Sequence, residues 1–281
     1  MTRRVKLFRP GKSFPSVSVS GPSCSMACDH CSKKYLGGMA DVSKPGALLE
    51  FARKLSDRGG KGMLISGGSD KSGAVMYRDH HFREMMEIKR ETPLVLNLHT
   101  GLITPDIADK ISRADVDTVS FDVIGDSETI TDVLHLNAAP DDFRQTYKLL
   151  TDSGIRVAPH VLAGINYGRL SGEKKAVDLI SEFKPDTAVL IILIPTRNTP
   201  MENVEPVPES KILDLGRYMK DRLEADLILG CMRPRSYRSL ERDLIEMGFS
   251  GIVLPRRDTV NWIRARGWDT VEEDACCAIP T

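Results

Sequence analysis

The sequence predicts an α/β fold of the (β/α)8 barrel type, because short strand-like runs alternate with helical patterns along almost the whole chain. The apolar residues in these runs are continuous, as expected for parallel strands that are buried on both faces. Their number also fits a barrel, with eight runs near residues 16–20, 61–66, 94–99, 117–122, 156–162, 187–194, 225–229 and 251–254. The alternative is an open doubly wound sheet, but no Gly-x-Gly-x-x-Gly fingerprint follows the first strand.

Helical segments separate these strands. Thr104-Pro105 begins one helix and Gly154 ends another. Two segments have apolar residues at helical spacing, namely Leu48, Leu49, Ala52 and Leu55, and then Ile212, Leu215, Tyr218, Met219 and Leu223. We therefore divide the chain into a basic, solubilising N-terminal arm (residues 1–14), the barrel (15–267) and a cysteine-bearing C-terminal tail (268–281) that folds over the barrel mouth.

The composition excludes several classes of protein. The chain has 281 residues, with 39 Lys and Arg against 39 Asp and Glu, so it lacks the positive excess typical of proteins that coat nucleic acid or anionic membranes. The longest apolar run, Ala188 to Ile194, is much shorter than the roughly 20 residues that span a bilayer. Six cysteines are too few for a disulfide-rich secreted protein, and no signal peptide begins the chain. We expect a cytoplasmic protein without a nucleic-acid or membrane partner.

Three cysteines follow the first strand, at the end where a barrel carries its chemistry. Cys24, Cys28 and Cys31 have the spacing C-x3-C-x2-C. Thiolates are ligands of both iron–sulfur clusters and zinc. A structural zinc site needs four protein ligands, and His30 is poorly placed between two of the cysteines to supply the fourth. Three thiolates suit a four-iron cluster in which one iron keeps an open position.

This motif resembles the signature of the radical S-adenosylmethionine (SAM) superfamily, C-x3-C-x-aromatic-C, with His30 at the aromatic position. The resemblance covers nearly the whole chain. It implies a 4Fe-4S cluster whose open iron binds S-adenosyl-L-methionine. In that superfamily, reductive cleavage of the cofactor gives a 5′-deoxyadenosyl radical, which removes hydrogen from unactivated carbon.

Further motifs at strand ends support this resemblance. The segment after the second strand, Gly67-Gly68-Ser69-Asp70, is similar to the family's Gly-Gly-Glu motif for the cofactor amine, but departs from it at Ser69. Pro195 to Pro200 is similar to a P-x-x-x-T-P turn of biotin-synthase-like members. At the end of the fourth strand, Ser120 and Asp122 occupy the position where relatives bind the ribose. At the end of the fifth strand, Gly164 and Ile165 are similar to the family motif that packs under the adenine. A helix N-cap or turn residue is an equally good interpretation of Asp122.

The other three cysteines occur late in the chain. Cys231 follows the seventh strand, and Cys276 and Cys277 lie in the tail. Together they could bind an auxiliary 4Fe-4S cluster, with Ser236 or an unidentified group as the fourth ligand. Arg235-Ser236-Tyr237 resembles the Arg-Ser-Ser-Tyr motif of lipoyl synthases, whose serine binds the auxiliary cluster. Under this interpretation Cys231, Arg235 and Ser236 take part in catalysis. The alternative is an uncommitted terminal pair and an ordinary buried thiol at Cys231.

The late cysteines and the chain length are most similar to the two-protein lipoyl synthases. This resemblance implies a sulfurtransferase that acts on an octanoylated lipoyl carrier protein together with a paralogous radical SAM partner, using ferredoxin or flavodoxin as electron donor. The last quarter of the chain is rich in arginine, with Arg233, Arg235, Arg238, Arg242, Arg256, Arg257, Arg264 and Arg266. An acidic carrier protein would fit these charges, but solvated helix faces explain them equally well. The alternatives are a biotin-synthase-like enzyme, a radical methyltransferase, or a non-catalytic iron–sulfur or zinc accessory subunit.

Overall fold

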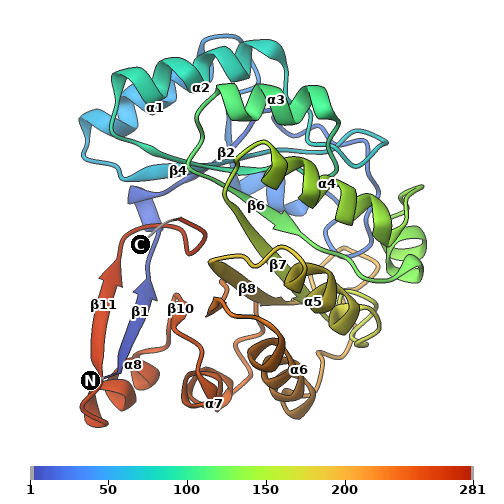
Figure 1. Cartoon of the computed structure of the whole chain (residues 1–281), viewed down its shortest axis with the longest axis vertical. Helices are drawn as coiled ribbons and strands as arrows, with labels where there is room; N and C mark the ends of the chain where they lie inside the picture. Colours follow the sequence, from blue (N-terminus) through green and yellow to red (C-terminus); the bar gives the residue numbers. More distant parts are fainter. Residues whose placement is uncertain (1–2, 280–281) are drawn as a thin grey trace.

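Eleven parallel strands form one curled sheet in the computed structural model, which describes residues 3–279. Figure 1 shows the strands as an arc with the helices around its outside. The order across the sheet is β11-β1-β10-β9-β8-β7-β6-β5-β4-β2-β3. Among the described residues the two outermost strands do not pair with each other, so the α/β fold is a curled, open arc and not a closed barrel.

All eight expected strands are present, with small differences at their ends. They are β2 (Ser16–Ser18), β4 (Gly62–Ser66), β5 (Val95–His99), β6 (Thr118–Asp122), β7 (Val157–Ala163), β8 (Thr187–Ile192), β9 (Asp226–Leu229) and β10 (Gly251–Val253). Three further strands are β1 (Arg4–Phe8), β3 (Ala40–Asp41) and β11 (Asp269–Glu273). Because every pair is parallel, the carboxyl ends of the strands lie along one edge of the arc, which we call the mouth.

A helix follows each of the eight expected strands and packs on the outer face of the arc. The expected start at Thr104 is confirmed, because its side chain accepts a hydrogen bond from the Ile107 amide and Pro105 is the first helical residue. The helices are α1 (Ala47–Asp57), α2 (Asp79–Glu91), α3 (Pro105–Arg113), α4 (Pro140–Asp152), α5 (Glu173–Ser181), α6 (Glu209–Arg222), α7 (Leu240–Met247) and α8 (Arg257–Ala265). Short turns of helix lie at η1 (Gly11–Ser13), η2 (Lys34–Gly38) and η3 (Thr129–Val133). No helix among residues 3–279 is long and apolar enough to cross a membrane.

The N-terminal segment is part of the sheet and not a solubilising arm. Strand β1 pairs with β10 on one side and with β11 on the other. Its apolar residues Val5, Leu7 and Phe8 are completely buried. The sequence-based boundary at residue 14 is therefore wrong in structural terms, because the strand alternates basic and apolar residues and lacks a continuous apolar run.

Residues 274–279 lie inside the arc. Asn97 Nδ2 in β5 donates a hydrogen bond to Cys276 Sγ over 3.3 Å, while Cys277 packs against Phe8 of β1 and Val189 of β8. These strands are on different sides of the arc, so residues 274–279 lie between them (Figure 1). Arg156, immediately before β7, donates from Nη1 to the Ala278 carbonyl over 2.6 Å. The tail therefore fills the inside of the arc and extends toward the edge opposite the mouth, instead of folding over the mouth.

The position of β1 predicts the effect of a core substitution. Replacing the fully buried Leu7 by Ala removes apolar contacts between β1 and the helices, and we expect the free energy of unfolding to fall by about 2–5 kcal/mol. Urea denaturation of the cluster-free protein measures this change. The control is Arg4→Ala on the same strand, where the side chain is exposed and the expected change is within about 0.5 kcal/mol. Equal stabilities of the two variants would contradict the packing of β1.

Candidate active site

The loop after β2 brings the first three cysteines to the mouth. Two backbone contacts hold Cys24: the Ser69 amide donates to its Sγ over 3.3 Å, and its thiol is 3.6 Å from the Ser69 carbonyl. The chain at Gly68 runs so close that an added Cβ would lie 2.0 Å from the Ser23 carbonyl oxygen. This position therefore requires glycine, because any side chain would displace the loop that carries Cys24.

The thiols of Cys28 and Cys31 are within hydrogen-bonding contact of each other. This contact lowers the pKa of Cys31 to about 7, whereas the same hydrogen bond and burial raise the pKa of Cys28. The Cys28 thiol also lies 3.5 Å from the Leu134 carbonyl. Three sulfur atoms from one loop, with a backbone N–H directed at Cys24, form a donor set that fits a four-iron cluster.

His30, at the aromatic position of the motif, has a ring nitrogen without a partner. Its Nδ1 is buried and makes no hydrogen bond among the described residues. Burial lowers the pKa of His30, although the carboxylates of Asp122 and Asp29 oppose this effect. A buried nitrogen without a partner beside the cysteines is expected where a bound ligand would supply the missing hydrogen bond.

The other expected cofactor-binding residues lie in loops along the same edge. Asp70 Oδ1 accepts hydrogen bonds from the Ser72 amide (2.8 Å) and hydroxyl (2.6 Å), so this oxygen stabilises its own turn. Gly164 has φ of +78°, and a Cβ there would lie 2.3 Å from Val207, which again requires glycine. Ile165 beside it is buried. Gly67 and Ser69 contribute backbone next to the cysteine loop, as described above. Their roles toward the cofactor stay predictions.

A row of polar side chains crosses three neighbouring strands on the inner face of the arc. His99 Nε2 lies 3.2 Å from Asp122 Oδ2. Burial raises the pKa of Asp122, but His99, His160 and His30 together lower it to about 2, so this carboxyl is ionised. Burial alone would lower the pKa of His99, and Asp122 raises it overall. His160 has a pKa lowered mainly by burial, and its Nδ1 lies 3.0 Å from the Ala158 carbonyl, which fits a neutral ring that donates there.

Ser120, expected at the ribose of the cofactor, forms hydrogen bonds with the side chain of Asn97. Its hydroxyl accepts a hydrogen bond from Asn97 Nδ2 (2.9 Å) and lies 3.1 Å from Asn97 Oδ1. The same amide nitrogen also donates to Cys276. Ser120 therefore belongs to the polar surroundings of the tail in this structure.

The late cysteines come near one another although they are distant in sequence, with Cys277 buried, Cys276 partly buried and Cys231 exposed. Cys231, in the loop after β9, is close enough to Cys276 and Cys277 for their charges to interact. A hydrogen bond from Cys277 lowers the pKa of Cys276 to about 7, while this contact and burial raise the pKa of Cys277. Thiols brought together in this way are suited to bind a metal cluster. Among the described residues no three His, Cys, Asp or Glu side chains are already arranged around a single metal ion.

Arg235 and Ser236 are exposed residues of the same loop. Arg235 Nη1 donates to the Leu254 carbonyl over 3.1 Å. Within residues 3–279, neither side chain makes a hydrogen bond with a cysteine, so their proposed roles beside an auxiliary cluster stay predictions.

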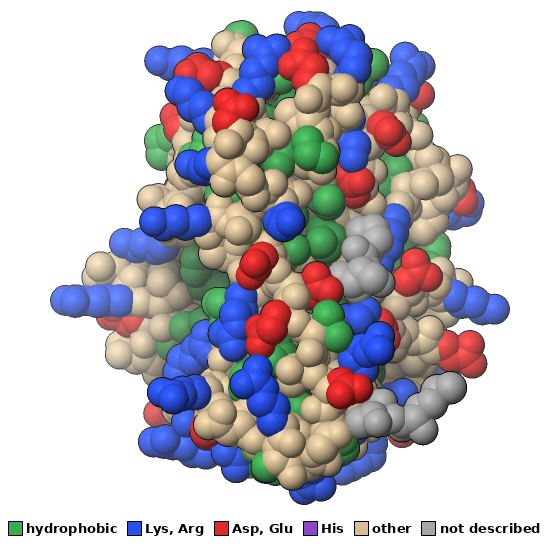
Figure 2. Space-filling view, turned by 90° about the vertical axis from the view of Figure 1, so that its left-hand side faces the viewer, with side chains coloured by type: hydrophobic (Ala, Val, Ile, Leu, Met, Phe, Trp, Pro, Cys, Tyr) green, Lys and Arg blue, Asp and Glu red, His purple; other side chains and the backbone are tan. Residues whose placement is uncertain are grey.

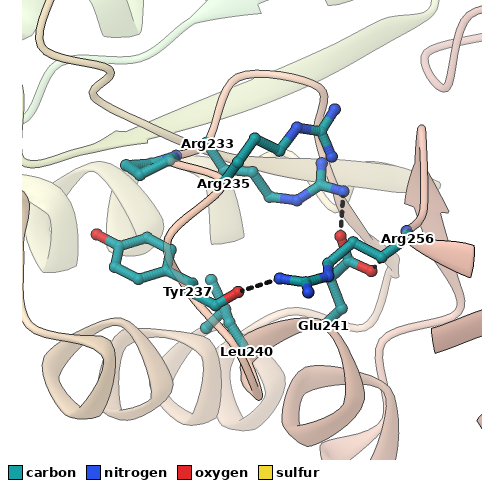
Figure 3. Close-up of a pocket in the computed structure, with 7 residues that line it drawn as sticks. Arg233, Arg235, Tyr237, Leu240, Glu241 and Arg256 are labelled. Atoms are coloured by element: carbon teal, nitrogen blue, oxygen red, sulfur yellow. Dashed lines mark hydrogen bonds and ion pairs between the residues drawn. The ribbon is translucent and has the colours of Figure 1, made fainter. Parts of the chain in front are cut away.

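A buried ion pair fixes the loop that carries Cys231. Arg233, only 3% exposed, donates to Glu241 Oε1 over 2.5 Å and to the carbonyls of Gly230 and Val253 over 2.6 and 2.9 Å. Figure 3 shows this pair, with Arg256 approaching from the other side of Glu241. The Arg256 amide donates to Glu241 Oε2 over 3.0 Å. From the sequence, Arg233 counts among the surface arginines, because its partner Glu241 lies in a separate helix, α7.

A profile of the radical SAM superfamily matches residues 18–175 of the sequence. The chain belongs to the radical SAM superfamily. Membership implies an enzyme that uses a 4Fe-4S cluster and S-adenosyl-L-methionine, in agreement with the thiols and the unpaired histidine nitrogen at the mouth. No protein in a curated set is significantly similar in sequence.

Solved structures of radical SAM proteins share this fold at low sequence identity. HydG, a maturase of the FeFe-hydrogenase, superposes with a TM-score of 0.64 and 14% identity over 89% of this chain and 57% of its own. Methylornithine synthase (PylB) gives 0.61 and 15% over 95% and 84%. SuiB from Streptococcus suis, bound to S-adenosylmethionine, gives 0.58 and 16% over 96% and 58%. The chain thus spans little more than half of the HydG and SuiB chains, and at these identities the similarity shows the fold alone.

The Arg233–Glu241 pair predicts a large stability change on substitution. Arg233→Met leaves a buried carboxylate without its partner, and we expect a loss of about 3–5 kcal/mol in the free energy of unfolding. The matched control is Arg235→Met, which removes an exposed guanidinium from the same Leu254 carbonyl and should change stability by less than about 0.5 kcal/mol. Urea denaturation of the apo protein measures both variants, and similar losses in the two would show that the buried pair is unimportant.

Proposed function

We propose that this radical SAM enzyme inserts sulfur into unactivated carbon, with a second 4Fe-4S cluster bound by Cys231, Cys276 and Cys277. The observation that supports the proposal is the hydrogen-bonded pair of thiols Cys276 and Cys277, with Cys231 near enough for its charge to act on both. Two distant parts of the chain supply them, and Arg233 and Asn97 fix their surroundings.

The N-terminal cysteines and the late cysteines have different roles in this proposal. When bound, the cofactors supply an electron, a 5′-deoxyadenosyl radical and the sulfur, so that one C–H bond is replaced by one C–S bond and the hydrogen leaves on 5′-deoxyadenosine. In this proposal Cys24, Cys28 and Cys31 would hold the first cluster, and the unpaired Nδ1 of His30 would be available to the cofactor. Cys276 and Cys277 lie deeper in the arc, so the reacting carbon would be held between the two clusters.

We further propose that the substrate is an octanoyl chain on an acidic lipoyl carrier protein. The mouth carries exposed apolar side chains, among them Tyr35 (42% exposed) and Leu254 (39%). Three arginines near the mouth, Arg235, Arg238 and Arg257, make no ion pair with an acid within the described residues. The other five of the arginine-rich quarter are paired, so the cations available to an acidic partner are these three.

Charged side chains also cover the open side of the arc. Figure 2 shows Lys and Arg interspersed with Asp and Glu over this face, with apolar side chains between them. A paralogous radical SAM enzyme and an electron donor of the ferredoxin or flavodoxin type complete the proposed reaction, one to share the two sulfur insertions and the other to reduce the cluster. Both bind transiently in this proposal, which fits a mixed surface better than a large apolar one.

Replacing the late cysteines tests the second cluster. After anaerobic reconstitution we expect about eight irons per chain in the parent protein and about four in the variant Cys231→Ala/Cys276→Ala/Cys277→Ala. The variant should still cleave S-adenosyl-L-methionine on reduction but transfer no sulfur. The control is Cys24→Ala, which should lose cleavage instead. Retention of all the iron in the triple variant would overturn the auxiliary cluster, and zinc without iron in the parent would favour an accessory subunit.

Mass spectrometry of the carrier tests the substrate. The reduced enzyme, incubated with octanoylated carrier protein and the cofactor, should add the mass of one sulfur atom to the carrier. Arg235→Glu/Arg238→Glu/Arg257→Glu should raise the KM for carrier about tenfold or more without altering cofactor cleavage, because the partner is acidic. The control is Arg217→Glu on the outer helix α6. An unmodified octanoyl chain in the presence of active enzyme and partner would exclude this substrate.

A further inference from the structure

One carboxylate connects three loops at the mouth. Asp29, between Cys28 and His30, is buried, and its two oxygens have different partners. Oδ1 lies 2.8 Å from His135 Nε2, and Oδ2 accepts a hydrogen bond from the Tyr167 hydroxyl over 2.6 Å. We call these three residues the Asp29 network. They come from the loops after β2, β6 and β7.

The backbone supports this arrangement at some energetic cost. His135 and Tyr167 both have left-handed backbone conformations, with φ of +53° and +48°. Such conformations cost on the order of 1–3 kcal/mol for residues other than glycine and persist where surrounding contacts require them. Here both strained residues direct a donor at the same carboxylate. The Asp29 amide also donates to the Val133 carbonyl over 3.0 Å, so the cysteine loop and the loop after β6 are bonded through backbone as well.

The position of the network determines what it can do. Its Asp29 lies within the cysteine motif, one residue from each of Cys28 and His30. Its Tyr167 belongs to the tight turn that begins at Gly164, where the Gly168 amide donates to the Gly164 carbonyl over 2.8 Å. The cysteine loop and the Gly164 turn carry residues that the sequence assigns to the cofactor, and the Tyr167–Asp29 hydrogen bond joins the two. This hydrogen bond therefore fixes the distance between the two loops before a ligand binds.

We propose that Asp29, His135 and Tyr167 are positioning residues that preassemble the S-adenosyl-L-methionine site by holding the cysteine loop against the Gly164 turn. None of the three touches the cofactor in this proposal. Their effect is on binding: loops already held in the bound geometry lose less conformational entropy when the ligand arrives. The inference depends on superfamily membership and not on which substrate receives the radical.

Single-atom changes test the network. Tyr167→Phe removes only the hydroxyl, and we expect the Kd for S-adenosyl-L-methionine to rise about tenfold in equilibrium binding to the anaerobically reconstituted, unreduced protein. The iron content and the cleavage rate at saturating cofactor should equal those of the parent. The change in the EPR spectrum of the reduced cluster on cofactor addition should require about tenfold more cofactor but reach the same end point.

Two further variants make the outcome decisive. His135→Met, which lacks a donor, should weaken cofactor binding as Tyr167→Phe does, whereas His135→Gln keeps an N–H donor and should restore it. The matched control is Tyr218→Phe, which removes the hydroxyl that donates to Asp178 over 2.8 Å on the outside of the arc and should leave the Kd unchanged. Parent-like affinity in Tyr167→Phe and His135→Met would overturn the proposal. So would an affinity loss that merely follows a loss of iron, since that would indicate a structural role.

Discussion

The pairing of β1 with both β10 and β11 is the constraint on which the rest of the site depends. Five residue pairs join β1 to β11, from Arg4 with Asp269 to Phe8 with Glu273, and the Arg9 amide extends the pairing to the Glu273 carbonyl over 2.7 Å. This register ends β11 at the open side of the arc, so the chain that follows enters its inside. Cys276 and Cys277 come near Cys231 because a strand at the beginning of the chain supports the strand that precedes them.

The loop that carries Cys231 has its own internal support. Arg233 donates to carbonyls before and after that loop and to Glu241, and Leu254, with φ of +48°, presents its carbonyl to both Arg233 and Arg235. Isolated buried ion pairs contribute little net stability. Arg233 also donates to three backbone carbonyls, and these hydrogen bonds hold the loop that carries Cys231 in one conformation. The strain at Leu254 is consistent with this, since an exposed leucine adopts the left-handed region only where its neighbours require it.

The sequence alone predicts the eight strands of the arc because their apolar runs are continuous, and it predicts the cysteine motif because its spacing is specific. It fails for β1 because basic and apolar residues alternate there, and for β11 because this edge strand is largely charged and has no buried residue. It also misses the Asp29 network, since His135 and Tyr167 are distant in sequence and carry no motif. The path of the tail could not be predicted, because its short apolar segment fits the mouth and the inside of the arc equally well.

The inner face of the arc has two chemically different sectors, and the tail lies between them. Strands β5 to β7 contribute Asn97, Ser120, His99, Asp122 and His160, whereas β1 and β8 to β10 contribute Phe8, Val189, Ile228 and Val253. Cys276 faces the first sector and Cys277 the second. An ionised carboxylate such as Asp122 is costly to bury without partners, so the polar side chains of β5 to β7 satisfy one another, with His99 beside Asp122 and Asn97 beside Ser120. The apolar sector needs no such partners. The tail therefore divides the inside of the arc into a hydrogen-bonded half and an apolar half.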